Sequence, residues 1–156
     1  MLGNPVIARA EMLIRRPVAE VFEAFIDPAI TTQFWFSKSS GRLQVGKYIQ
    51  WDWEIYNVSK QVYVGAIEKN KRISIEWGAT TSALTSVEWI FTPYPIDTTF
   101  LTITNSGFVG TDEEIMRKAL ASTAIFMLVL AGLKALLEHN IRLNLVLDRY
   151  PEGKIQ

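Results

Sequence analysis

Residues 111–138 read TDEEIMRKALASTAIFMLVLAGLKALLE, and this stretch decides the fold. Thr111 and Glu114 have the spacing of a capping box, in which each side chain satisfies a free backbone N–H group of the other residue. The acidic residues 112–114 also suit the positive end of a helix dipole. At the far end, Asn140 can stop the helix in a left-handed conformation. The stretch therefore predicts one long, largely apolar helix.

Strands are predicted before this helix, because short stretches that alternate between apolar and polar residues are separated by turn residues. The first covers residues 6–14, and about six more follow at 43–45, 48–56, 58–69, 72–77, 83–91 and 98–106. In the stretch 48–56, one face holds Ile49, Trp51, Trp53 and Ile55, and the other holds Gln50, Asp52 and Glu54. Consecutive strands joined by short turns predict an antiparallel sheet with one apolar face.

Two short helices are predicted between the first strand and the later ones. Pro17 suits the first position of a helix, where its missing N–H group costs nothing, and the apolar residues within 18–25 then recur at helical spacing. Asp27 can cap a second helix that begins at Pro28 and runs to about Trp35. These two helices are expected to close one end of the domain.

The strands and the long helix must bury their apolar surfaces in one arrangement. The sheet must curl so that its apolar face covers the helix. We therefore predict a single α+β domain over residues 1–156, with a curved antiparallel sheet of six or seven strands around the helix. Such an arrangement encloses a space, and the aromatic residues that face this space suggest an oily ligand.

Composition excludes several classes of function. Lys+Arg and Asp+Glu both count 16, so no basic surplus exists to neutralise phosphates, and nucleic acid is not expected as a partner. The chain has no cysteine, which removes disulfides, thiolate metal sites and cysteine nucleophiles and fits a reducing cytoplasm. The longest wholly apolar run, residues 124–133, is far short of the roughly 20 residues that span a bilayer, so a buried core helix is expected. No signal peptide is expected either.

The order of the motifs resembles a known family. The segments that carry the resemblance are RPVAEVFEAF at 16–25, DP at 27–28, FWF at 34–36, LQVG at 43–46, VEWIF at 87–91, LTITNSGF at 101–108 and LAGLKALLEH at 130–139. Together they are similar to the START-like, or SRPBCC, superfamily with its helix-grip fold, and most of all to its AHSA1-like, polyketide-cyclase-like branch. The resemblance implies binding of hydrophobic small molecules, with some members acting as cyclases or chaperone partners, and it supplies no shared catalytic motif.

One departure from the family lies early in the long helix. Residues 124–126 read AIF where the family often has a Gly-Trp or Gly-Gly-like pair. The bulkier side chains are expected to narrow the cavity.

We expect a hydrophobic ligand, lipid-like or aromatic and polyketide-like, between the sheet and the long helix. The candidate lining residues, chosen by strand face, by helix position and by the cavity of the family, are Trp35, Trp51, Trp53, Trp77, Trp89, Phe91, Phe126 and Leu130. Ordinary core packing explains such aromatic residues equally well. Five tryptophans are many for this length, however, and a buried indole N–H group needs a partner, which favours a pocket.

Two alternatives remain open, a cyclase or dehydratase and a chaperone-associated interaction module. An enzyme needs an acid or base that faces the cavity, but strand alternation turns Asp52 and Glu54 to the opposite face. His139, the only histidine, is expected to sit at the helix end, where the dipole favours a cation. We expect no catalytic residue, no metal site and no cofactor.

The tail from Ile141 to Tyr150 alternates between aliphatic and polar residues and predicts an extended segment that is packed on one side. Its aliphatic side chains must be covered by something. Coverage by the domain itself is favoured, because monomers rarely leave large apolar patches bare. The other possibility is a second copy across a two-fold axis, so the protein is expected to be a monomer or a homodimer.

Overall fold

The long helix and the sheet of the computed structural model, which describes residues 5–80 and 83–152, have the predicted arrangement. The strands are β1 (Ala8–Ile14), β2 (Lys38–Ser39), β3 (Tyr48–Trp53), β4 (Val58–Glu68), β5 (Arg72–Gly78), β6 (Thr85–Tyr94) and β7 (Thr98–Ser106). They form one antiparallel sheet in the order β1-β7-β6-β5-β4-β3-β2. The helices are α1 (Val18–Ile26), α2 (Pro28–Thr31), the 3-10 turn η1 (Glu54–Tyr56), α3 (Asp112–His139) and α4 (Leu145–Arg149).

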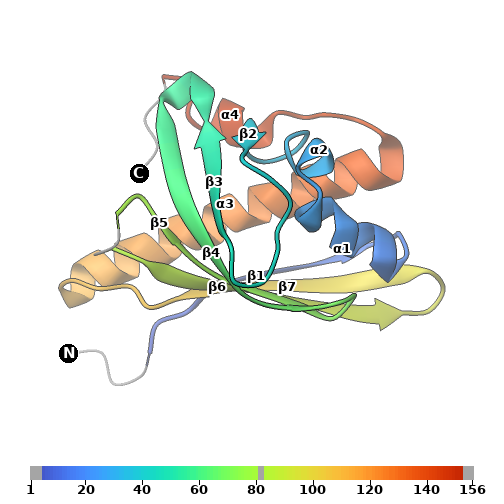
Figure 1. Ribbon diagram of the computed structural model, residues 1–156, viewed down its shortest axis with the longest axis horizontal. Helices are drawn as coiled ribbons and strands as arrows, with labels where there is room; N and C mark the ends of the chain where they lie inside the picture. The colour runs from blue at the N-terminus through green and yellow to red at the C-terminus, as the bar shows by residue number, and fades with distance from the viewer. Residues whose placement is uncertain (1–4, 81–82, 153–156) are drawn as a thin grey trace.

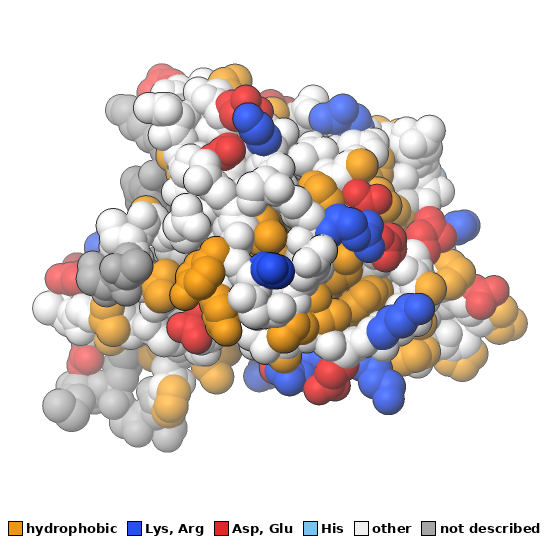
Figure 2. All heavy atoms as spheres, viewed as in Figure 1, with side chains coloured by type: hydrophobic (Ala, Val, Ile, Leu, Met, Phe, Trp, Pro, Cys, Tyr) orange, Lys and Arg blue, Asp and Glu red, His pale blue; other side chains and the backbone are white. Residues whose placement is uncertain are grey.

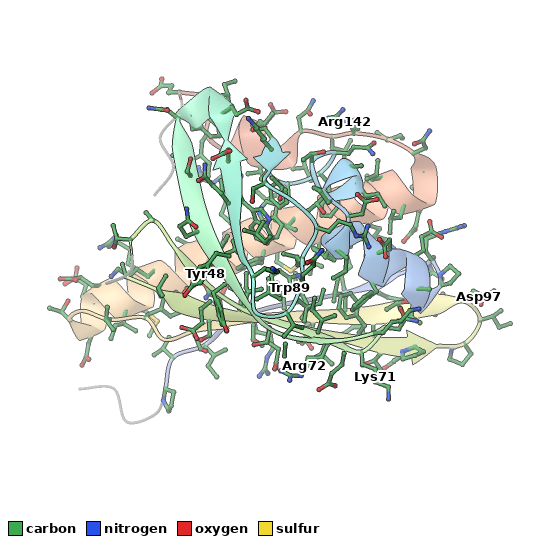
Figure 3. All side chains as sticks on the ribbon, in the orientation of Figure 1. Tyr48, Lys71, Arg72, Trp89, Asp97 and Arg142 are labelled. Carbon is green, nitrogen blue, oxygen red and sulfur yellow. The ribbon has the colours of Figure 1, made fainter. Side chains whose placement is uncertain are left out.

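The sheet curls around α3, as the helix-grip fold requires (Figure 1). A register shift between Val64 and Ala66 lets β4 bend, since a β-bulge raises the local twist of a strand. In Figure 1 the β3–β4 end of the sheet turns upward, whereas β1, β6 and β7 lie below α3. The inward side chains form one core; Trp89, for example, is 1% exposed and lies in the interior, whereas Arg72 and Lys71 lie on the outer side (Figure 3).

Both predicted ends of α3 are confirmed. The backbone N–H of Glu114 donates to the Thr111 hydroxyl at 3.2 Å, and Asn140 adopts a left-handed conformation with φ 54°. Near its end the helix is tied to β1, because Lys134 Nζ donates to the carbonyl of Leu13 at 3.0 Å and to the Glu138 carboxylate at 2.6 Å. These contacts fix α3 along the edge strand of the sheet.

The glutamate at this end of α3 is held in its charged form. Burial raises the pKa of Glu138, but the hydrogen bonds from the Arg15 N–H and from Lys134 outweigh it and lower the pKa overall. The carboxylate therefore stays charged and bonded at neutral pH.

By length and composition α3 could cross a membrane, and it is the one such helix in the described part of the chain. Its residues Phe126, Val129, Leu130 and Leu133 are nevertheless buried within the domain. We interpret α3 as the core helix of the sheet.

Both short helices are present, although α1 begins one residue after Pro17 and α2 ends sooner than predicted. Asp27 caps α2, since its carboxylate accepts the N–H of Ala29 at 2.9 Å. Pro17 precedes the first turn of α1 and accepts the N–H of Val21 at 3.2 Å. Helix α2 ends at Thr31 rather than near Trp35, and the chain continues through turns.

Two strand predictions were wrong. Residues 43–45 form no strand; the N–H of Leu43 instead donates to the carbonyl of Ile26 at 3.3 Å, and the strand in this region is the two-residue β2. Strand β3 ends at Trp53, after which η1 turns the chain and leaves Ile55 72% exposed. The turn closes at Asn57, which adopts a left-handed conformation that asparagine tolerates better than most residues.

The prediction of an extended tail was also wrong. After Asn140, residues 141–144 run without regular structure, and α4 follows. Val146 is 4% exposed, whereas Ile141 and Leu143 are 49% and 43% exposed, so the alternating pattern does not mark the buried face. A helical turn buries Val146 against the domain, and the Tyr56 hydroxyl holds it in place by donating to the carbonyl of Leu147 at 2.5 Å.

Candidate functional site

A cavity of about 380 Å³ opens between the curled half of the sheet and the first half of α3. Its walls come from β4, β5, the start of β6, the end of β7, α3 and the tail at Val146 and Tyr150. The apolar lining residues are Trp35, Trp53, Val58, Trp77, Leu84, Phe108, Ile125 and Phe126. A volume of this size suits a small organic ligand, because ligand pockets usually measure roughly 300–1,000 Å³.

The structure divides the eight predicted lining residues into two groups. Trp35, Trp53, Trp77 and Phe126 line the cavity. The other four are buried in the core away from the cavity, namely Trp51, Trp89, Phe91 and Leu130. Residues on one apolar face therefore separate into cavity wall and core according to where α3 covers them.

The aromatic wall is a packed cluster. The ring of Trp77 lies 5.7 Å from Trp35 and 5.9 Å from Phe126, and Trp35 lies 5.7 Å from Phe126. Edge-on and tilted contacts of this kind hold rings in fixed orientations. Behind Trp35, the ring of Trp51 stacks on Phe36 at 4.5 Å and supports the wall from the core. The wall is thus preorganised by contacts within the protein.

Lys60 is the one ionisable side chain that the sheet contributes to this cavity within the described residues. Its Nζ lies 3.8 Å from the ring centre of Trp77 and 5.8 Å from that of Trp53. The residue is half-buried, and its ammonium group rests on ring faces, which attract cations. Burial among these rings lowers the pKa of Lys60 to about 8.

The sequence carried a signal for Lys60 that the choice of candidate residues missed. In strand β4, Lys60 is in phase with Val58, Val62 and Val64, which face inward, whereas Ser59 and Gln61 are exposed. An alternating strand turns every second side chain to the same face, so Lys60 had to face inward as well. Lys60 therefore has to be added to the candidate lining residues.

A polar group also closes the cavity on the β7 side. The side-chain amide of Asn105, which is 3% exposed, donates to the Thr85 hydroxyl at 2.8 Å and to the carbonyl of Ser86 at 2.9 Å. Its oxygen accepts the hydroxyl of Ser122 from α3 at 2.8 Å. Both donors of this amide are therefore used within the protein, and the network links β6, β7 and α3.

The two remaining cations stand on the first turns of α3. Arg117 is exposed, and Lys118 is half-buried and donates to the carbonyl of Val109 at 2.8 Å. Both line the cavity together with Lys60. No aspartate or glutamate lies among the lining residues that the structure describes. The cavity thus combines an apolar wall with positive charge.

The carboxylates considered as catalytic acids lie elsewhere. Asp52 accepts hydrogen bonds from Ser59 at 2.5 Å and from Gln50 at 2.9 Å on the outer side of the sheet. The bond from Ser59 is the main cause that lowers the pKa of Asp52. Glu54 is exposed, as is His139, and none of the three lines the cavity. Among the described residues, no group of three or more metal-ligating side chains is positioned to hold a metal ion.

Solved structures share this fold. A protein from Staphylococcus saprophyticus, SSP2350, is 29% identical with a TM-score of 0.75, and the match covers 88% of this chain and 95% of that one. DynU16, described as a putative protein in the dynemicin biosynthetic locus, is 21% identical with a TM-score of 0.77, over 89% of this chain and 49% of that one. The Aha1 dimer from Colwellia psychrerythraea is 17% identical with a TM-score of 0.72, over 86% and 97%.

The comparison with curated proteins found no match. A family model does match, and it spans residues 15–138, from the end of β1 to the last turn of α3. These residues include strands β2–β7 and nearly all of α3, which form most of the cavity wall. The chain therefore belongs to the family of Activator of Hsp90 ATPase homolog 1-like proteins.

Proposed function

We propose that this protein binds a hydrophobic small molecule in the cavity between the sheet and α3. The observation that carries the proposal is the cavity of about 380 Å³ whose wall is built from Trp35, Trp53, Trp77 and Phe126. A ligand that packs against these rings removes apolar surface of both the ligand and the protein from water. The favourable free energy is roughly 25 cal/mol per Å² of apolar surface buried. Binding is the function that this lining supports best.

A role as a cyclase or dehydratase receives less support from the site. General acid–base chemistry needs a titratable group within hydrogen-bonding reach of the substrate. Asp52 and Glu54 do not line the cavity, and Lys60, the titratable group that the sheet contributes, has no carboxylate or histidine beside it among the described lining residues. We therefore favour a carrier or sensor of a lipid-like or aromatic compound over an enzyme.

The test places a bulky side chain in the cavity by substituting a residue of α3. Ala121 lines the cavity, whereas Ala124 is exposed on the same helix and does not. The uncharged fluorescent probe N-phenyl-1-naphthylamine is titrated into the native protein, Ala121→Phe and Ala124→Phe. We expect the native protein and Ala124→Phe to bind alike, and Ala121→Phe to lose about ten-fold or more in affinity, because the added ring occupies the site.

A second measurement makes this test decisive. Native mass spectrometry of protein purified from its own host is expected to show a co-purified hydrophobic compound, which metabolite and lipid analysis then identifies. Circular dichroism must show that both variants fold. Absence of any co-purified compound together with no probe binding by the native protein would refute the proposed function.

A further inference from the structure

The geometry points to a ligand with a carboxylate group, which forms an ion pair with Lys60 while its apolar body lies against the tryptophan wall. This inference rests on the proposed function, because it names the chemical class of the molecule that the same cavity binds. It adds a charged anchor to a site for which only aromatic and aliphatic lining residues were predicted from the sequence.

The first argument is the incomplete coordination of the Lys60 ammonium group. Within the described chain it has no carboxylate within ion-pairing distance and no hydrogen-bond acceptor, and only the faces of Trp77 and Trp53 lie against it. The two other half-buried lysines of the described chain find oxygen partners: Lys134 bonds Glu138 at 2.6 Å and Lys118 bonds a carbonyl at 2.8 Å. An ammonium group has three donors and no acceptor, so Lys60 can bond an oxygen that a ligand brings.

The second argument is the sign of the charge around the cavity. Lys60 enters from the sheet, and Arg117 and Lys118 enter from α3. None of the lining residues that the structure describes is acidic, although the whole chain has equal numbers of acidic and basic residues. On the face shown in Figure 2, by contrast, acidic and basic side chains are interspersed. A concave, low-dielectric site with charges of one sign concentrates the opposite charge, so this cavity attracts anions.

The third argument is that the remaining polar groups cannot replace Lys60 as the anchor. Both amide hydrogens of Asn105 are already donated to Thr85 and Ser86, and the Ser122 hydroxyl is donated to Asn105. Of the three cations at the cavity, Arg117 is exposed and Lys118 already bonds the carbonyl of Val109, so Lys60 is the half-buried donor that is left for an acidic group. A charged hydrogen bond to a carboxylate is roughly twice as strong as a neutral one, which makes this single contact selective.

The lowered pKa of Lys60 agrees with this picture. The apolar rings disfavour the ammonium form in the ligand-free protein and bring its pKa to about 8. A bound carboxylate would favour the charged form and raise the pKa again. An anion that enters the cavity would therefore stabilise the charged form of Lys60.

The experiment compares two ligands with the same chain and different head groups. The affinities of decanoate and decan-1-ol are measured at pH 7 by their displacement of bound N-phenyl-1-naphthylamine. The proteins compared are the native protein, Lys60→Met, Lys60→Arg and Lys69→Met. Lys69 is exposed in the turn after β4 and does not line the cavity. Lys69→Met therefore removes one positive charge, as Lys60→Met does, but at a position outside the cavity. We expect the native protein and Lys69→Met to prefer decanoate by about ten-fold, consistent with one charge-assisted bond.

In Lys60→Met the preference for decanoate is expected to disappear, while decan-1-ol binds about as tightly as before because the aromatic wall is intact. Lys60→Arg should keep part of the preference, since its charge is retained in a different geometry. Equal binding of both ligands by the native protein, or a preference that survives in Lys60→Met, would overturn the inference and leave the proposed function standing. If the native protein binds neither ligand nor the probe, both the proposed function and the inference fail.

Discussion

At the scale of single residues, Lys60 combines a cost to folding with the proposed role as an anchor in the cavity. A lysine that faces inward from a strand gives up hydration, and the faces of Trp53 and Trp77 replace it incompletely. Its pKa near 8 expresses this cost, because folding disfavours the charged form. Residues that lower stability in this way are found where proteins bind ligands.

The prediction is that Lys60→Met stabilises the ligand-free protein at pH 7. Methionine fills a similar volume without a charge, and we expect a gain on the order of 1–2 kcal/mol, which is less than the full pKa shift implies because Lys60 is only half-buried. Urea unfolding of the two proteins at pH 7 measures this difference. A loss of stability in Lys60→Met would contradict the account of the buried charge.

The same prediction has a defined pH dependence. The pKa of Lys60 is about 8 in the folded protein and near its ordinary value of 10.5 in the unfolded chain, so between these pH values the unfolded chain binds more protons. The native protein therefore gains stability relative to Lys60→Met as the pH rises from about 8 to about 10.5, and the difference is largest below pH 8. The other titratable groups at the cavity, Arg117, Lys118 and Tyr150, are present in both proteins and cancel in the comparison.

At the scale of elements, the fold depends on how α3 is fastened to the sheet. Its last turns are held to β1 through Lys134 and Glu138. Its first half stands over the cavity, where fewer apolar contacts are possible, and there Asn105 and Ser122 provide a polar link. This hydrogen bond joins α3 to β7 beside the cavity.

We expect Asn105→Ala to lower the free energy of unfolding by about 2–3 kcal/mol. The substitution removes three hydrogen bonds and leaves the Ser86 carbonyl and the Ser122 hydroxyl without their partner. Ser122→Ala removes only one of these bonds and should cost about 1 kcal/mol. Chemical denaturation measures the free energy of unfolding of both variants. An equal loss in the two variants would mean that the hydrogen bonds from Asn105 to β6 contribute little.

At the scale of the whole molecule, the tail completes the domain. Val146 in α4 is buried, and both Val146 and Tyr150 line the cavity, although they lie beyond the segment that matches the family model. The ring of Tyr150 also lies 6.5 Å from that of Tyr56, next to the bond between Tyr56 and Leu147. The tail thus serves as a wall of the site and as part of the core.

This placement predicts how the tail responds to substitution. Val146→Ala should lower stability by about 1–3 kcal/mol, because it removes buried methyl groups. The double substitution Ile141→Ser/Leu143→Ser should change neither stability nor mass in light scattering, since both side chains are largely exposed in the single chain. A native dimer that the double substitution dissociates would show instead that these two residues form an interface between copies.

The sequence by itself determined the elements whose signals are local. The cap at Thr111 and the left-handed Asn140 bound the long helix, and strand alternation placed the tryptophans on the inner face. These features follow from hydrogen bonds and side-chain directions within a few residues, so no knowledge of the rest of the chain is needed. The match between a curved sheet and one long apolar helix then followed from the need to bury both apolar faces.

Which of the inward-facing residues line the cavity depends on contacts between distant parts of the chain. Trp53 and Trp51 share one face of β3, yet the first lines the cavity and the second lies in the core, because the curl of the sheet and the path of α3 determine what covers each residue. The tail shows the same limit: its alternation suggested a strand, but the contact that buries Val146 favoured a helical turn. Alternation along a strand tells on which face of the sheet a side chain lies. The residues that it contacts across the core are distant in the sequence, so alternation does not predict them.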